Sequence, residues 1–447
     1  MDRKFTNVIL LGFAFMFVFT AFQTMGNIEK TILDSIKHED PTYEGDGYTS
    51  LAIIYAVLAI CNWLAPSVIS VTGPKLAMIL GAITYSFFIG TFLMPSTWLL
   101  YVASAVVGAG AAIIWTGQGS YLILNSDSTT ISRNSGIFWA MLQCSMFFGN
   151  TFVFFMFQGK TIIDKETRSL VFIVLLVVSA VGILFLLVLR TTVSSSGSEE
   201  EAQTPLPAAS GPLYALKRAF SLFLTKEMML LSCTFFYTGV ELSFFSGVYS
   251  SSIGFTQQLG ENAKQLVGMS GIFIGVGEVA GGALFGILGK KTIRWGRDPI
   301  VIIGFLIHIL AFFLIFLNIP NAAPLGETND EAFMTSNAVV AILCSLLLGF
   351  GDSCYNTQIY SILGGIFPED SAPAFALFKF TQSLAAAACF FYSSHTGLYI
   401  QLGVLVVTGI IGTITFCMVE WKAKAKSETG YNGEIGTSCA ESPSKSE

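Results

Sequence analysis

Four charged residues lie inside long apolar runs of this sequence, where an ionised side chain is costly. They are three acids, Glu241, Glu278 and Asp352, and one base, Lys379. Ionisable groups within a membrane usually mark proton relays, ion paths or counter-ions of a ligand. A carboxyl group that alternates between dry and wet surroundings can take up and release a proton. We therefore take these four residues as candidates for proton or substrate coupling.

Asp352 and Lys379 lie at similar depths in two consecutive apolar runs, 338–363 and 371–393. If the first run points inward and the second outward, Asp352 is about 11 residues and Lys379 about 8 residues from the inner end. Their depths then differ by only about 5 Å, and we expect the two side chains to interact. Two interpretations stay open: a static link between two helices, or a pair that opens and titrates during a cycle.

The remaining ionisable residues in apolar runs also allow more than one role. Glu278 lies in a glycine-rich stretch, 271–282, which is typical of closely packed membrane helices. It is either a packing acid bonded to the backbone or a proton carrier. Glu241 suits substrate binding and proton binding equally well. We interpret His308, in the run 299–317, as a packing residue.

Uncharged polar side chains in the apolar runs form a second set of candidates, which would line a central cavity. A weak internal repeat aligns some of these residues, in the first half of the chain, with the acids of the second half. We therefore expect every buried acid to lie in the second half. The set consists of Gln23, Asn62, Gln118, Gln143, Asn150, Asn356 and Gln358.

The composition places the chain in a lipid bilayer. Apolar residues make up 53% of the chain, charged residues only 12%, and the mean hydropathy is +0.68; a soluble protein carries about twice that charge. The net charge of −6 offers no basic surface for nucleic acid. We find no phosphate-binding loop, nucleophilic serine motif or Cys/His cluster, so no enzyme, metal site or cofactor is expected. Seven of the eight cysteines fall in apolar runs, which indicates no disulfide framework.

Twelve apolar runs are long enough to span a membrane, in two groups of six. The sequence predicts an N-terminal six-helix half at 1–190 and a C-terminal six-helix half at 226–421. Between them we expect a disordered linker at 191–225, because its start is rich in Ser, Glu, Ala and Pro. A second disordered segment is expected in the tail at 422–447. The predicted fold is an all-α membrane protein of twelve helices.

Lysine and arginine placement predicts the orientation. With the N-terminus in the cytoplasm, sixteen of the 23 basic residues fall on the cytoplasmic side, six on the outer side and one, Lys379, in the membrane. Basic residues are enriched in cytoplasmic loops. Both termini are therefore expected in the cytoplasm, while the membrane in which the protein resides is not indicated.

Two groups of six spans joined by a cytoplasmic linker resemble the plan of the major facilitator superfamily. In that superfamily helices 1, 4, 7 and 10 line a central cavity and 2, 5, 8 and 11 flank it; the four charged residues map to helices 7, 8, 10 and 11. The stretch 286–297 resembles the superfamily's gating motif but lacks its usual aspartate, so we expect a weaker gate or one built differently. The gating candidates are Gly289, Arg294, Gly296 and Arg297.

Several short motifs resemble the uncoordinated-93-like family within that superfamily. The likeness extends from about Phe5 to about Glu420 and fails in the linker and tail. The motifs are Arg133–Ala140, Gly47–Ser50, Ser270–Glu278, Gly351–Ser353 with Asn356–Gln358, and Glu369–Phe375. The resemblance implies a transporter fold. Some members act as regulatory subunits of ion channels or as trafficking chaperones, so it identifies no substrate residues.

Two functions follow. The first is a secondary transporter that moves an unknown small solute by alternating access, coupled to protons through the C-terminal acids. The second is a non-transporting partner that regulates or escorts another membrane protein. The eroded gating motif favours the second, and four costly buried charges favour the first.

Overall fold

Long apolar helices build the molecule. The computed structural model describes residues 3–126, 130–190, 212–367 and 370–438; this part is helical apart from turns and loops and one isolated bridge between Thr256 and Thr328. Eleven of its helices are long and apolar enough to cross a membrane, and a twelfth, α2, is shorter. A bilayer offers the backbone no water to bond, which favours helices. The predicted all-α membrane fold is confirmed.

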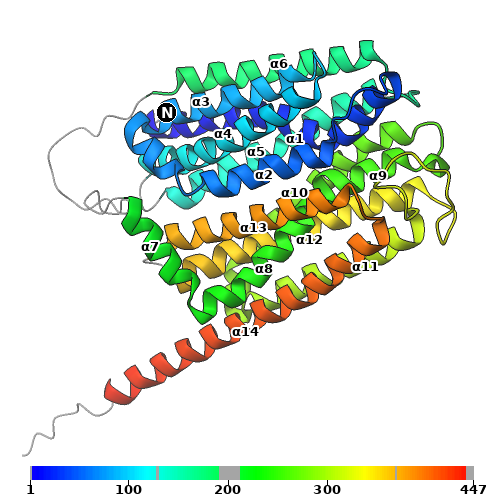
Figure 1. The fold of residues 1–447 in the computed structure, drawn as a ribbon. Coiled ribbons are helices and arrows are strands. Elements are labelled where there is room, and N and C mark those ends of the chain that lie inside the picture. The colour runs from blue at the N-terminus through cyan, green and yellow to red at the C-terminus, as the bar shows by residue number, and fades with distance from the viewer. Residues whose placement is uncertain (1–2, 127–129, 191–211, 368–369, 439–447) are drawn as a thin grey trace, which may run out of the picture.

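The first six spans form one group (Figure 1). Its helices are α1 (Arg3–Glu39), α2 (Gly47–Cys61), α3 (Ala65–Thr91), α4 (Thr97–Leu124), α5 (Ile131–Met156) and α6 (Lys165–Val188). The second span, which the apolar run 48–71 predicts as one helix, is broken after Cys61. Gly73, with φ of 74°, then bends the chain before Pro74, because glycine adopts this conformation without strain.

The last six spans form the second group. Its seventh span is composite: α8 (Lys226–Ser243) continues through a π-helical segment, η1 (Phe244–Tyr249), into α9 (Ser250–Phe255). The other elements are the short turn η2 (Gln257–Leu259) and the helices α10 (Ala263–Trp295), α11 (Asp298–Asn318), α12 (Ala338–Ile366), α13 (Ser371–Ser393) and α14 (Leu398–Ser438).

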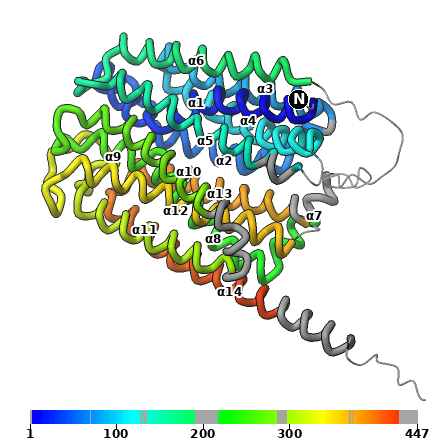
Figure 2. The backbone as a smooth tube through the Cα atoms, turned by 180° about the vertical axis from the view of Figure 1, so that it is seen from behind, coloured from blue at the N-terminus to red at the C-terminus, as the bar shows by residue number. Residues whose placement is uncertain are grey.

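The two groups lie side by side with their helices roughly aligned, as Figure 1 and, from behind, Figure 2 show. They meet mainly where α2 packs against α13 and α5 against α10. The N-terminus and the far end of α14 lie at the same end of the bundle, which we call the termini end. We call the opposite end, where α1 turns into α2, the loop end.

Two segments expected to be disordered are partly helical. Residues Pro212–Phe223 of the predicted linker form α7, whose Ala219 and Leu222 are buried; α7 packs against α13. Apolar residues at helical spacing give α7 one face that burial stabilises. In the predicted tail, α14 continues to Ser438, helped by good helix formers such as alanine and lysine after Trp421. The rest of both predictions, 191–211 and 439–447, lies outside the described residues.

Candidate functional site

Glu241 faces a histidine that the sequence interpretation assigned to packing. Glu241 lies one turn before the π-helical segment η1. This type of irregularity is frequent at functional sites. Both Glu241 and His308 of α11 are 0% exposed, and His308 Nε2 lies 2.9 Å from Glu241 Oε1. No donor among the described residues is aligned for a hydrogen bond to either carboxyl oxygen of Glu241. His308 is therefore a direct neighbour of Glu241, a contact that the sequence analysis did not predict.

The hydrogen-bond partners of the two ring nitrogens indicate the tautomer of His308. Tyr237 Oη lies 2.6 Å from His308 Nδ1, and His308 Nε2 lies 3.2 Å from the carbonyl oxygen of Leu348. A tyrosine hydroxyl can donate to Nδ1, which leaves the ring proton on Nε2, between the Leu348 carbonyl and Glu241; this assignment follows from the partners. Tyr237, Glu241 and His308 thus form a fully buried cluster of groups that can pass a proton, here called the histidine cluster.

The histidine cluster lies directly against Asp352. The His308 ring packs on the backbone of Gly351, where any Cβ would overlap it. Asp352 is 9% exposed and accepts a hydrogen bond of 2.7 Å from Asn356 Nδ2, one turn further along α12. Asn356, a predicted cavity residue, is therefore the partner of the acid.

Lys379 does not form the expected ion pair with Asp352. Its ammonium group donates to Gln382 Oε1 at 2.9 Å and lies over the rings of Phe378 and Tyr360, at 4.6 and 5.8 Å from their centres. Tyr360 follows Asp352 by eight residues, or about 12 Å along the helix. The lysine side chain reaches toward the termini end, where rings and an amide hold it, and the estimate from depth alone missed this direction.

Glu278 is held from the other half of the molecule. Gln143 Nε2 on α5 donates to Glu278 Oε2 at 2.7 Å, across the contact between α5 and α10. Glu278 is half-buried, and its partner is this amide instead of the backbone group that one interpretation expected. The glycine-rich stretch does bring helices together: a Cβ at Gly277 would overlap the carbonyl oxygen of Leu346 on α12.

The polar candidates of the first half connect to residues that the sequence analysis did not single out. Ser145 donates to Gln23, and Asn27 Nδ2 donates to Asn150 Oδ1 at 2.7 Å and to the Val267 carbonyl of α10 at 3.1 Å. A polar residue one helical turn beyond Gln23 on α1 was the available signal for Asn27.

The last three predicted cavity residues have different surroundings. Gln118 is buried in α4, and Gln358 donates to its neighbour Thr357. Asn62 is the C-cap of α2, at the break between α2 and α3, and so lies at a helix end instead of inside a helix.

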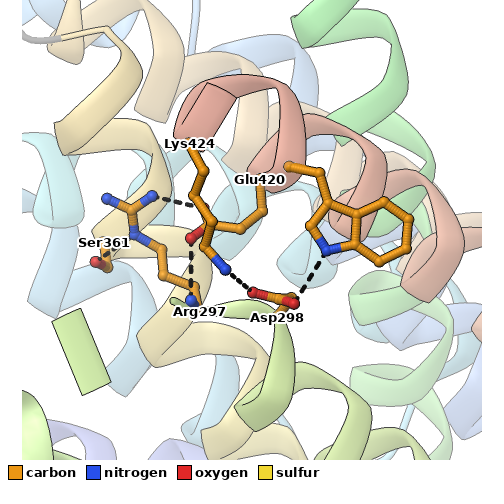
Figure 3. A network of polar contacts seen from close by, with 6 residues as sticks. Arg297, Asp298, Ser361, Glu420 and Lys424 are labelled. Atoms are coloured by element: carbon orange, nitrogen blue, oxygen red, sulfur yellow. Dashed lines mark hydrogen bonds and ion pairs between the residues drawn. The ribbon is translucent and has the colours of Figure 1, made fainter. Parts of the chain in front are cut away.

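The gating stretch ends in a polar network at the termini end (Figure 3). Arg297 Nη1 pairs with Glu420 Oε2 at 2.7 Å, its backbone N–H donates to Glu420 Oε1 at 3.0 Å, and its Nε donates to Ser361. Asp298 pairs with Lys424 at 2.5 Å and accepts a bond from Trp421. The gating motif lacks its usual aspartate, but two other acids, Asp298 and Glu420 of α14, form ion pairs in this network.

Gly296 of the gating stretch has a backbone conformation that favours glycine. Its φ is 96°, and a Cβ there would overlap Lys424. The surroundings of Gly289 and Arg294, the other two gating candidates, lie outside the described part of the structure. All the described contacts of the network join α11, α12 and α14, within the second group.

A second network closes the loop end. Asp46 caps α2 and accepts bonds from Thr49, from Lys30 at 2.6 Å and from Ser394 at 2.6 Å. Ser394 lies at the end of α13, so this bond joins the two groups. Burial alone would raise the pKa of Asp46, but the Lys30 charge and these hydrogen bonds lower it to about 2.

The described residues contain no group of three or more His, Cys, Asp and Glu side chains suited to a metal ion. What the central arrangement can do is hold protons and polar groups. Its carboxyls lie on three helices of the second group, and one of them contacts an amide of the first.

A family model and several relatives match almost the whole chain. The model described as ion channel regulatory protein UNC-93 matches residues 39–417. UNC93-like protein MFSD11 of Xenopus laevis is 47% identical over 95% of this chain and 98% of its own. UNC93-like protein 3 of Arabidopsis thaliana is 26% identical over 90% of this chain and 83% of its own.

Solved transporter structures share the fold at low sequence identity. A peptide transporter, POT, in complex with sulfate superposes with a TM-score of 0.67 at 13% identity, over 92% of this chain and 93% of that protein. The nucleoside transporter NupG, as a D323A mutant, gives 0.62 at 14% identity, over 92% and 99%. At such identities the likeness concerns the fold alone.

Proposed function

The chain belongs to the UNC-93 family, and we propose that it is a secondary transporter that moves a small solute by alternating access and couples this movement to protons. It is a multi-pass membrane protein of the major facilitator fold, and we expect no catalytic activity. The solute carriers among its structural relatives support a transport role without naming the solute.

The observation that carries the proposal is the hydrogen bond between Gln143 and Glu278. It places an acid of the second half in contact with an amide of the first, at the interface that must open and close. A charged group there would bond the amide strongly, since hydrogen bonds to ionised groups are roughly twice as strong as neutral ones. Protonation of Glu278 would therefore weaken the contact between the halves.

Asp352 and the histidine cluster extend this coupling into the second half. Asp352 and His308 meet at the backbone of Gly351, and His308 reaches Glu241. A carboxyl in dry surroundings favours the protonated form and becomes more acidic when water reaches it. We propose that water entering from one side of the membrane and then from the other changes the proton affinity of these acids, which drives the exchange.

The described conformation fits a state closed at the loop end. Among the described side chains, hydrogen bonds between the halves lie at the loop end, as for Ser394 with Asp46 and Asn27 with Val267, or at the centre, as for Gln143 with Glu278. We propose that the termini end faces the cytoplasm, which agrees with the distribution of lysine and arginine.

Purified protein in proteoliposomes tests this function. An imposed pH gradient, combined with a broad panel of metabolites, should produce solute-dependent proton flux, and Glu278→Gln should abolish its pH dependence. Exposed Glu166 on α6 provides a matched control as Glu166→Gln, which should leave the flux unchanged. Absence of flux for every solute would contradict transport.

The second candidate is a regulatory or trafficking partner of another membrane protein or ion channel. The description of the matched family model, an ion channel regulatory protein, favours it. A partner of this kind needs no pH-driven exchange between conformations. If the conformation of the protein does not change with pH and no solute-dependent proton flux is found, the regulatory or trafficking role is favoured.

A further inference from the structure

We propose that the central site recognises a small zwitterion, with its cationic group near Glu278 and Asp352 and its anionic group at Lys379. This inference rests on the proposed transport function and specifies its substrate class. It comes from how the charges of the central site are satisfied.

Each of these three charged side chains bonds a neutral group of the protein. Glu278 accepts from the amide of Gln143, and Asp352 accepts from the amide of Asn356. Lys379 donates to the amide oxygen of Gln382 and lies over two aromatic rings. Among the described residues, no ion pair includes Glu278, Asp352 or Lys379. Acids and a base thus lie on the neighbouring helices α10, α12 and α13 without neutralising one another directly.

A carboxyl or ammonium group that is partly buried without a counter-charge is costly to ionise, and a ligand of opposite charge beside it stabilises the ionised form. An amine alone would satisfy the acids and leave Lys379, whereas a carboxylate alone would satisfy Lys379 and leave the acids. A zwitterion satisfies both. Its net charge of zero also lets it enter without adding charge to a site that already holds both signs.

The separation of the charges selects the shape of the solute. The ring of Tyr360, over which Lys379 lies, is two helical turns, or about 12 Å of helix rise, from Asp352. A solute whose ammonium and carboxylate are several bonds apart therefore fits better than one that carries both on the same carbon.

Aromatic side chains from both halves lie near Lys379. Trp139 of α5 is 39% exposed, and its ring lies 6.3 Å from the ring of Tyr360 on α12. Phe378 lies beside Lys379 on α13. The apolar body of a zwitterion would rest on these rings, and Trp139 and Tyr360 would sense it from opposite halves.

Matched sets of solutes test the inference through thermal unfolding of the full-length protein in nanodiscs. One set is 6-aminohexanoate with hexylamine and hexanoate; the other is L-phenylalanine with phenethylamine and 3-phenylpropanoate. We expect 6-aminohexanoate to raise Tm most, and each zwitterion to raise it more than its singly charged counterparts. A singly charged member that matches or exceeds its zwitterion, or no shift with any member, would overturn the inference.

Substitutions assign the two ends of the solute. Lys379→Gln should weaken binding of 6-aminohexanoate about tenfold, as expected for one lost charge-assisted hydrogen bond, and make it equal to hexylamine. Lys379→Arg should retain most of the binding, and exposed Lys165→Gln is the control. Equal binding by Lys379→Gln and the unmodified protein would contradict the assignment.

The outcome separates this inference from the proposed function. If the zwitterions fail while pH still shifts the protein between two conformations, the substrate class is wrong and the transport proposal stands. If both the zwitterions and the pH-driven exchange fail, the transport proposal itself is wrong.

Discussion

At the scale of single residues, two pairs of ionisable side chains should respond differently when both members are mutated. Glu241 and His308 touch at 2.9 Å without exposure to solvent, whereas Asp352 and Lys379 bond separate amides. Contacting residues usually show non-additive effects when both are changed, and separated residues add within about 0.5 kcal/mol.

We therefore predict opposite results for two double-mutant cycles measured by thermal or denaturant unfolding. Glu241→Gln combined with His308→Gln should deviate from additivity by about 1 kcal/mol or more. Asp352→Asn combined with Lys379→Gln should deviate less from additivity, because these two residues bond different amides and share no ion pair. Additivity of the first pair, or strong coupling in the second, would contradict the contacts described.

Asp46 gives a prediction that depends on pH. Its pKa is lowered to about 2, so its ionised form stabilises the folded state above the ordinary pKa of 3.8, and this contribution is lost as the pH falls through about 2. Asp46→Asn should lower Tm clearly at neutral pH and less at about pH 3. Glu166→Gln serves as the surface control, and a Tm difference that does not shrink on acidification would count against the Lys30 and Ser394 contacts.

Asp352 and Lys379 do not share the ion pair that the sequence predicted. The expectation that every buried acid lies in the second half is also wrong, because Glu29 of α1 is fully buried. Depth along a helix could place Asp352 and Lys379 at one level, but not the direction in which the lysine side chain extends. His308 was interpreted as packing because one histidine in an apolar run carries no sign of the acid on another helix. Only the fold brings the side chains of α8 and α11 together, so that His308 meets Glu241.

At the scale of elements, close helix contacts depend on particular glycines. Gly277 of α10 meets the backbone of α12, whereas nothing lies within 4 Å of a Cβ placed at Gly282 on the same helix. Gly277→Ala should cost about 1 to 3 kcal/mol or prevent folding, because backbone atoms cannot yield easily. Gly282→Ala should be tolerated. Equal expression and Tm for both variants would refute this account of the α10–α12 contact.

The network at the termini end yields a second comparison between elements. Glu420 is 3% exposed and bonds both the side chain and the backbone of Arg297, so Glu420→Gln should lower the stability of the α11–α14 contact by about 2 kcal/mol. Lys422→Gln breaks only a surface pair with Glu227, which should have little effect. Similar losses of Tm in both variants would be inconsistent with the network.

The sequence predicted the twelve spans and their grouping because apolar runs of bilayer length leave few alternatives. It missed α7 and the extension of α14, since a polar linker and tail resemble disorder by composition. Contacts with α13 stabilise α7, and residues of high helix propensity favour the extension of α14. The overall composition of these segments shows neither effect. The break after Cys61 was hidden because both of its flanks are apolar.

At the scale of the whole molecule, the central claim is that protonation of acids in the second half drives exchange between a state closed at the loop end and one closed at the termini end. Exchange requires that the two ends move in opposite directions. Bonds such as Ser394 to Asp46 must break when the loop end opens, while the termini end closes.

The most direct measurement is the distance between spin labels at both ends as a function of pH, in nanodiscs and with the eight native cysteines replaced. Exposed positions suit the labels: Glu44 with Thr335 at the loop end, and Arg190 with Leu224 at the termini end. Between about pH 5 and about pH 8 we predict that one distance lengthens while the other shortens, and that Glu278→Gln removes this response. Distances that stay constant at both ends across this range in the unmodified protein would contradict the claim.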